Sequence, residues 1–539
     1  MSDTPREIPY RSVGEWAFES EVIYDEPFVD LILDATFMAP SGRTLSMPGF
    51  YDGDNVWRVR FSPDEVGSWH YRIQTRPADA ALQQEGSFTV TAVEGPGFLK
   101  STPGRAWGFE TESGEPVFLM GDTVYNLFGA AYCGMDVTSF LRRRAEQGFN
   151  FFRARMQVSP YHPPEGYSEW QTRSSWPWGG SEQSPRFDRL NLEYFRSVDQ
   201  VVQTAAELGV GFEMIMEAWG FEYPFNNRAI FLPEWEEVWM RYLVARYDAY
   251  ASVYFWTLMN EYEFYPDGNA RHTGVEDRWA MRIARWLKSL SPHGHVISVH
   301  NAPQMPPFAQ RFKLDPGAVD AVMFQAWGTT GEQDAWLTAG IEEAIRKSFA
   351  DWSGSAVFVE YGYERNADLP LTFPPFTYLD AEHNRRGAWR GVFCGMGICN
   401  GFENSWGPVM DLERDQEGVR YFQHLHRFVT EVVPFHKLRP AQQLLAEPEL
   451  AYAKGYTPLV LASDDHDLVA VYFPAGGRAM LALPSSGYTA QWYDPRDGTV
   501  HSGQVNQAPA GLDVAAPVDK DAEGQPRDWV LTLVAPTLR

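Results

Sequence analysis

The apolar run Trp256-Thr257-Leu258-Met259-Asn260-Glu261 ends abruptly in an Asn–Glu pair, and further along the chain Ala356-Val357-Phe358-Val359-Glu360 also ends in a glutamate. Short apolar runs of this kind, rich in β-branched and aromatic residues, predict buried β-strands. In a (β/α)8 barrel, side chains at the C-terminal ends of different strands converge on one cleft. The two runs therefore predict a site that contains a pair of carboxyl groups.

Residues 98–435 alternate apolar runs with amphipathic helices, which is typical of a parallel α/β sheet or barrel. The predicted helices Thr138–Gln147 and Asn191–Leu208 are each followed by a glycine that can end a helix. Neither G-x-G-x-x-G nor G-x-x-x-x-G-K-[ST] follows a strand, so nucleotide binding has no support. Eight strand candidates favour a closed TIM barrel over an open sheet; they are Val117–Gly121, Phe151–Met156, Gly211–Glu217, Val253–Asn260, His295–His300, Ala321–Gln325, Ala356–Glu360 and Gly397–Glu403.

Short strands with alternating polarity flank the α/β region on both sides. Trp57–Phe61 and Trp69–Ile73 alternate around the turn Pro63–Gly67, which predicts an antiparallel hairpin. Near the other end, Trp492-Tyr493 precedes the turn Asp494–Gly498. The prediction is an α/β TIM barrel over residues 98–435, flanked by two all-β sandwich domains, 1–97 and 436–539.

Composition narrows the range of partners. The formal net charge of −26 disfavours nucleic acid and anionic membrane surfaces, and the aromatic content of 15% favours carbohydrate, whose ring faces stack on aromatic side chains. Three cysteines do not imply a disulfide framework, the first residues lack the apolar core of a signal peptide, and no run reaches transmembrane length. We expect a cytoplasmic protein with a small carbohydrate substrate and neither nucleic acid nor membrane as partner.

Two glutamates at strand ends are the groups that glycoside hydrolysis requires. One must be protonated to protonate the leaving oxygen, which calls for surroundings that raise its pKa, and the other must be ionised. Such chemistry needs no metal and no cofactor, and we expect neither. The pair His293 and His295 imitates a metal motif, but the sequence shows no third ligand of suitable spacing.

Four stretches span most of the central region: Pro116–Thr123, Gly148–Arg153, Phe187–Asn191 with Tyr194-Phe195, and Met259–Glu261. They resemble the apiosidase-like and "cellulase-like" barrel proteins of clan A glycoside hydrolases. The resemblance implies that Glu261 ends strand 4 as the general acid/base and that Glu360 ends strand 7 as the nucleophile. It also implies a contact from Asn260 to the sugar 2-hydroxyl, an N-terminal immunoglobulin-like domain and a C-terminal sandwich.

Strand-end position marks further candidates for contact with substrate, although barrel-mouth polar residues often only hold loops in place. Two of them, Trp327 and Trp406, are favoured as stacking platforms, because an indole at a strand end has no room inside the barrel. The clan commonly places near strand 6 a tyrosine that bonds the nucleophile; here Gln325 and Trp327 occupy that region. The set is Asp122, Arg153, Glu217, Trp219, His300, Gln325, Trp327 and Trp406, with Arg155 and Asn301 beside its members, and Asp122 could instead pair with Arg153.

Three other glutamates compete with these assignments. Glu263 is an alternative acid, Glu364 is expected to be a loop charge, and Glu213 is expected to form a structural pair. The long aromatic segment Tyr161–Ser184, with Trp178 near its end, is expected to wall the cleft and so to favour a pocket over an open groove.

The sequence therefore predicts a retaining glycoside hydrolase that releases a terminal sugar from a short oligosaccharide or glycoside. Family analogy suggests a pentose such as apiose or arabinose, although the fold does not determine the substrate. The alternatives are an endo-acting β-glycanase with an open groove and a non-catalytic carbohydrate-binding protein on a barrel scaffold. A lyase acting on uronic acids would need more basic residues than the net charge of −26 suggests. The two sandwiches are expected to brace the barrel or to assemble a homo-oligomer.

Overall fold

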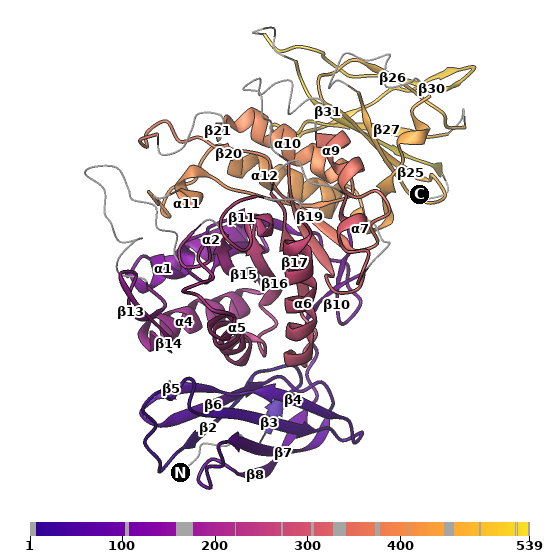
Figure 1. Cartoon of the computed structure of the whole chain (residues 1–539). Coiled ribbons are helices and arrows are strands. Elements are labelled where there is room, and N and C mark those ends of the chain that lie inside the picture. Colours follow the sequence, from indigo (N-terminus) through magenta and orange to yellow (C-terminus); the bar gives the residue numbers. More distant parts are fainter. Residues whose placement is uncertain are drawn as a thin grey trace.

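The chain is stacked in three parts, with the barrel between two β domains (Figure 1). In the part of the chain that the structure describes, no helix combines the length and the apolar character needed to cross a membrane. The structure is a computed structural model, and it describes residues 7–102, 107–157, 176–220, 222–270, 273–302, 307–326, 341–371, 378–407, 409–446, 457–484, 487–522, 524 and 526–536.

The N-terminal part is a sandwich of two sheets. Strand β7 (Gly67–Arg76) buries every second side chain, as the alternation in the sequence predicts. The predicted hairpin is wrong, because β6 (Val56–Phe61) and β7 lie in opposite sheets; their apolar faces meet across the core, where the rings of Phe61 and Trp69 are 5.4 Å apart. One sheet has the order β1 (Glu7–Pro9), β8 (Glu85–Thr91), β7, β3 (Ile32–Met38) and β4 (Thr44–Pro48), and the other has the order β2 (Gly14–Glu19), β6 and β5 (Phe50–Gly53).

The central part is a closed barrel of parallel strands, which confirms the predicted TIM barrel. The strands bury nearly every residue, since one face fills the barrel and the other packs on the helices. The predicted strand boundaries shift by a few residues, most of all where the first strand begins, at Met120, and where the last ends, at Asn400; Glu403–Trp406 then form a short helix. In order the strands are β11 (Met120–Thr123), β12 (Phe151–Arg155), β15 (Gly211–Trp219), β16 (Val253–Asn260), β17 (Val296–His300), β18 (Ala321–Gln325), β19 (Ser355–Glu360) and β22 (Gly397–Asn400).

Helices connect the strands around the outside of the barrel. The Asp136 side chain caps α2 by accepting from the Ser139 N–H, and Asn191 caps α4 by accepting from the Tyr194 N–H. Gly209 ends α4 in a left-handed conformation at φ 69°, as its position in the sequence predicts. The helices are α1 (Leu127–Tyr132), α2 (Val137–Glu146), α4 (Leu192–Leu208), α5 (Pro233–Tyr247), α6 (Val275–Leu290), α7 (Phe308–Arg311), α9 (Ile341–Ser348), α10 (Ala381–Phe393), α11 (Glu403–Trp406) and α12 (Gly418–Arg427).

Three separate two-stranded sheets lie outside the barrel strands. The hairpin of β9 (Leu99–Ser101) and β10 (Phe109–Thr111) packs Leu99 and Phe109 against barrel residues such as Phe151 and Val296, and so covers the N-terminal end of the barrel. The other pairs are β13 (Trp178–Ser181) with β14 (Ser184–Leu190) and β20 (Tyr363–Glu364) with β21 (Tyr378–Leu379).

The C-terminal part is also a sandwich, and its larger sheet is buried on both faces. Tyr472 and Tyr493 pack on Trp389 of α10, while Val471 and Leu531 face the smaller sheet. The larger sheet has the order β23 (Arg439–Pro440), β24 (Leu459–Ala462), β25 (Leu468–Phe473), β31 (Trp529–Val534), β27 (Thr489–Tyr493) and β28 (Val500–Ser502); the smaller has β26 (Arg478–Leu481), β30 (Gly511–Ala515) and β29 (Asn506–Ala508).

Buried polar contacts join the flanking domains to the barrel. Arg385 of α10 pairs with buried Asp528 of the C-terminal sandwich at 2.9 Å. On the other side, His293 Nδ1 lies 2.7 Å from Asp248 Oδ2, and its Nε2 accepts from the Ser62 backbone N–H at 3.1 Å. Asp248 is the third metal-type group that the sequence did not reveal beside His293 and His295. Because both ring nitrogens of His293 bond to protein atoms, this cluster is an interdomain contact.

Candidate active site

The two strand-end glutamates lie at the C-terminal ends of two barrel strands that are separated by β17 and β18. Glu261 follows directly after β16, and Glu360 is the last residue of β19. One imidazole connects them: the Glu261 backbone N–H donates to His300 Nδ1 at 3.2 Å, and His300 Nε2 lies 3.5 Å from Glu360 Oε1. Because a single ring spans the gap, the two residues border one site.

Glu360 Oε1 is the point where three polar groups meet. Arg153 Nη1 donates to it at 2.9 Å, the Tyr125 hydroxyl donates to it, and His300 Nε2 lies at 3.5 Å. The Glu360 residue is only 5% exposed. The guanidinium and the phenol together hold this buried carboxyl oxygen in a fixed position.

Arg153 of β12 is fully buried and donates to four partners, one of which is the Tyr125 hydroxyl at 3.3 Å. Its Nε donates to Glu213 Oε2 at 2.7 Å, Nη1 donates to Glu360, and Nη2 donates to Asn260 Oδ1 at 3.2 Å. The Asn260 oxygen is thereby occupied, whereas its buried Nδ2 has no hydrogen-bond partner among the described residues. A buried amide donor in that state is available to a hydroxyl group of a ligand.

Glu261 occupies a different environment from Glu360. Its backbone is left-handed at φ 50°, an uncommon conformation for a non-glycine residue that costs on the order of 1–3 kcal/mol. Burial, followed by the charge of Glu360, raises its pKa to about 8, against a smaller lowering by the hydrogen bond from Gln325. A raised pKa is what a general acid requires, and Glu261 is the member of the pair whose surroundings raise it.

His300 is held in its neutral form. Burial, with the nearby charge of Arg153, lowers its pKa well below the usual value. Because Nδ1 accepts the backbone N–H of Glu261, the ring proton is on Nε2 and points toward Glu360. The histidine thus orients the two glutamates and adds no charge.

An aromatic wall lines the side of the site next to Glu360. The Tyr363 and Tyr125 hydroxyls are 3.3 Å apart, and Trp406 stacks on Tyr363 with ring centroids separated by 3.9 Å. The Arg155 guanidinium carbon lies 4.3 Å from the ring centroids of both Tyr125 and Trp219. The wall consists of Tyr125, Ile215, Trp219, Tyr363, Tyr378 and Trp406, which form one buried cluster.

Several predicted site residues gather here and others do not. The structure brings Arg153, Asn260, His300, Gln325, Trp219 and Trp406 to the two glutamates or to the aromatic wall. Trp327 lies outside the described residues, as does most of the segment Tyr161–Ser184. Trp178, at the described end of that segment, is buried 4.5 Å from the ring of Trp239 on α5, so it belongs to the core and not to a cleft wall.

Asp122 and Glu217 are buried, and each is bonded to an arginine outside the site. Asp122 accepts from Arg144 Nε at 2.8 Å and from the Ser405 hydroxyl at 2.9 Å, and therefore does not form the pair with Arg153 that the sequence left open. Burial raises the Glu217 pKa to about 8, and its carboxyl group bonds to Arg228. Both side chains hold loops in place, which is the structural alternative for barrel-mouth polar residues.

The competing glutamates have structural partners. Glu263 accepts from Arg311 Nη1 at 2.5 Å and from the Ala302 N–H at 2.7 Å. Glu364 is buried and accepts from Asn384 and from the Gly418 N–H, so it is not the loop charge that was expected. Glu213 pairs with Arg153, as expected.

Tyr125 and Tyr363 are absent from the sequence-based set. Neither is the last residue of a strand: Tyr125 comes two residues after β11, and Tyr363 comes three residues after Glu360. Each tyrosine follows a predicted strand-end residue by three positions, Tyr125 after Asp122 and Tyr363 after Glu360. This closeness could have identified them, because residues that directly follow a barrel strand still lie at the mouth of the barrel.

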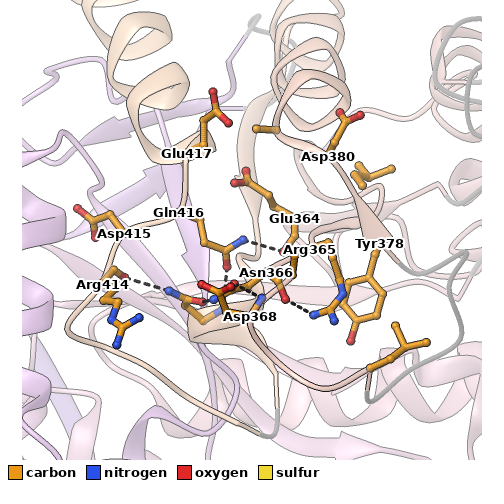
Figure 2. Close-up of a pocket in the computed structure, with 15 residues that line it drawn as sticks. Glu364, Arg365, Asn366, Asp368, Tyr378, Asp380, Arg414, Asp415, Gln416 and Glu417 are labelled. Atoms are coloured by element: carbon orange, nitrogen blue, oxygen red, sulfur yellow. Dashed lines mark hydrogen bonds between the residues drawn. The ribbon is translucent and has the colours of Figure 1, made fainter.

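A cavity of about 740 Å³ opens on the same side of the barrel (Figure 2). Two amide side chains of its wall donate to protein atoms: Gln416 Nε2 to the Glu364 backbone carbonyl at 3.0 Å, and Asn366 Nδ2 to Asn404 Oδ1 at 2.6 Å. Tyr378 lines the cavity and has its ring 6.1 Å from that of Trp406, which connects the cavity wall to the aromatic wall of the site.

The family comparisons agree with this geometry. Residues 105–432 match "Apiosidase-like, catalytic domain", residues 10–76 match a domain of unknown function, DUF5060, and residues 440–534 match "Putative collagen-binding domain of a collagenase". A closed parallel barrel with this match defines a glycoside hydrolase. The chain belongs to the apiosidase-like family.

Solved structures share the architecture. The crystal structure of "a putative glycoside hydrolase from Bacteroides vulgatus ATCC 8482" has a TM-score of 0.71 and 18% identity and covers 98% of this chain and 99% of its own. A glycoside hydrolase family 5 protein from the same organism has a TM-score of 0.61 and 17% identity, with coverage of 82% and 94%. At these identities the likeness shows a common fold. None of the curated proteins matches the chain by sequence.

Proposed function

We propose that this glycosidase works with retention of anomeric configuration and releases a terminal sugar from a short oligosaccharide or glycoside. The observation that carries the proposal is the contrast between the two glutamates. Glu360 accepts from Arg153 and Tyr125, whereas Glu261 has a pKa raised to about 8 by burial and by the Glu360 charge. The raised pKa of Glu261 supports its role as the acid, and the two donors to Glu360 support its role as the nucleophile.

In the first step, Glu360 attacks the anomeric carbon while Glu261 gives its proton to the glycosidic oxygen, and the leaving group departs as an alcohol. In the second step, Glu261 takes a proton from water, whose oxygen attacks the anomeric carbon and displaces Glu360. The free Asn260 amide donor supports a contact to a ring hydroxyl that strengthens in the transition state.

Two observations support a small, uncharged terminal sugar. The nucleophile is 5% exposed and Asn260 is fully buried, so a reacting sugar must enter a closed space. The charges of Arg153 and Arg155 are offset by Glu213, Glu360 and Glu222, which leaves no surplus positive charge for an acidic sugar. Enclosure favours the end of a saccharide over its middle.

The test is a panel of aryl glycosides in both anomeric and both ring forms, with the wild type and with Glu360→Gly in the presence of azide. We expect one sugar to be released by the wild type, and the variant to be inactive with water but to form the glycosyl azide of opposite configuration. An azide product of unchanged configuration, or a variant as active as the wild type, would contradict the proposal.

The cavity beside the aromatic wall favours a second candidate, endo-acting hydrolysis of a longer glycan. Its volume of about 740 Å³ falls within the range of about 300–1,000 Å³ typical of ligand pockets, and it leaves room for further sugar units. Digestion of an oligosaccharide labelled at its reducing end separates terminal from endo-acting hydrolysis. A terminal enzyme releases single sugars, and an endo-acting enzyme yields a ladder of lengths.

A further inference from the structure

Gln325, the last residue of β18, is bonded to the acid and not to the nucleophile. Its Nε2 donates to Glu261 Oε1 at 2.6 Å and to the Asn301 carbonyl at 2.7 Å, and the residue is 2% exposed. Its backbone pairs in register with Glu360 on the neighbouring strand, but the donors to that carboxylate come from Tyr125 and Arg153. The last side chain of β18, the sixth barrel strand, therefore hydrogen-bonds to Glu261 and not to Glu360.

The orientation of the Gln325 amide is determined by Asn301. The Asn301 carbonyl can only accept, so the amide nitrogen of Gln325 must face it, and the second hydrogen of that nitrogen is left for Glu261. Asn301 is itself held by Gln325, because its Oδ1 accepts the Gln325 backbone N–H at 3.0 Å and its Nδ2 donates to the Gln325 carbonyl at 3.2 Å. Hydrogen bonds to Asn301 thus fix both the backbone and the side chain of Gln325.

We propose that Gln325 is a positioning residue that decides which oxygen of Glu261 carries the catalytic proton. The proposal rests on the role of Glu261 given under Proposed function. Since Oε1 accepts from the amide, the proton of the neutral acid is on Oε2, and Oε2 is the atom that exchanges it.

The proton follows one route through both steps. As the glycosidic bond breaks, Oε2 gives its proton to the leaving oxygen, and the carboxylate that forms keeps its hydrogen bond from Gln325 on Oε1. As water attacks, Oε2 takes a proton from that water, and the acid returns to its starting state. Because a hydrogen bond to a carboxylate is stronger than one to a neutral acid, Gln325 favours the transition state of the first step, in which the carboxylate forms, over its ground state.

Other charged and titratable groups face Glu261 from every side. Glu360 lies on β19, Glu263 follows in the next turn, Arg153 lies on β12, and neutral His300 lies on β17. Loss of the Gln325 donor removes a contact that lowers the pKa of Glu261 and leaves these four in place. The proton is then held more tightly and without a fixed position.

The experiment compares two glycosides of the same sugar, one with a dinitrophenyl leaving group, which departs without protonation, and one with a phenyl leaving group, which needs it. In Gln325→Met, we expect kcat/KM for the phenyl glycoside to fall about tenfold or more, while the dinitrophenyl glycoside loses less than about threefold. The alkaline limb of the phenyl pH profile should move to higher pH.

Gln325→Glu keeps the shape of the side chain and provides a second variant if Gln325→Met does not fold. Gln442→Met is the matched control, since Gln442 lies in the C-terminal sandwich, is half-buried and also donates to a backbone carbonyl, that of Pro458, at 2.9 Å. Equal losses on both glycosides, or an alkaline limb that stays in place in a folded variant, would overturn the proposal. If Glu261→Ala does not spare the dinitrophenyl glycoside, the assigned role of Glu261 itself fails, independently of Gln325.

Discussion

Replacement of Arg153 by methionine should damage stability and activity for separate reasons. Arg153 and Glu213 are both fully buried with Nε and Oε2 2.7 Å apart, and methionine leaves the Glu213 carboxylate without its counter-charge. Breaking one side of a buried pair costs about 3–5 kcal/mol. At about 2 °C per kcal/mol for a domain of this size, the unfolding midpoint should fall by about 6–10 °C.

The same substitution removes the donors that hold Glu360 and Asn260. The bond to Glu360 is charge-assisted at 2.9 Å, and such bonds are worth about 1.5–3 kcal/mol, so kcat/KM should fall about 10- to 150-fold. The double variant Arg153→Met with Glu213→Gln separates the two effects. Neutralising Glu213 should recover most of the midpoint while kcat/KM on the substrate found in the glycoside panel stays low.

The pH dependence gives a further check on the buried charge. In Arg153→Met the unpaired Glu213 has a pKa raised by burial in the folded state, so the folded chain binds more protons than the unfolded one and loses stability as pH rises. The deficit in midpoint should therefore be larger at pH 8 than at pH 6. Recovery of activity together with stability in the double variant would refute a direct role of Arg153 in the site, and an unchanged midpoint in the single variant would refute the argument from the buried pair.

Four more outcomes are expected. Activity should fall as pH rises through about 8, where Glu261 loses its proton, and a pH profile of kcat/KM that stays flat beyond that point would contradict the assignment. Tyr125→Phe removes a donor from Glu360 and should lower kcat/KM about tenfold or more with little change in midpoint, whereas Tyr488→Phe in the C-terminal sandwich should leave kcat/KM unchanged. Asp528→Asn leaves buried Arg385 short of a partner and should lower the unfolding midpoint without changing kcat/KM, with a loss of about 3 kcal/mol. Incubation with a chelator should change neither midpoint nor activity, because both ring nitrogens of His293 bond to protein atoms; a loss on chelation that zinc restores would show a metal at that cluster.

Buried contacts hold the flanking domains against the barrel. The larger C-terminal sheet is buried against α10 on one face and against the smaller sheet on the other, and the N-terminal sandwich is tied to the barrel through His293 and through Arg60, which pairs with Asp199 at 2.8 Å. The larger C-terminal sheet, whose central strands are covered on both faces, therefore leaves no broad face for a ligand among the described residues.

Local patterns in the sequence were sufficient for the barrel and for the two glutamates. Each strand is a short apolar run bounded by polar residues, and the last residue of a barrel strand necessarily lies at the mouth, so Glu261 and Glu360 could be placed without coordinates. The same reasoning placed Asn260, Arg153 and His300 near them. In all these cases, position along one strand determines position in the fold.

Pairing between segments distant in the chain was decided only by the tertiary structure. Alternation gave β6 and β7 each an apolar face but could not show that these faces meet across a sandwich, and strand-end position could not show that Asp122 turns to Arg144 or Glu217 to Arg228. Tyr125 reaches Glu360 from 235 residues away, and the buried amide of Gln325 selects Glu261 because Asn301 orients it. A side chain's partner is set by which donors and acceptors burial brings within about 3 Å, and that depends on the packing of the whole barrel.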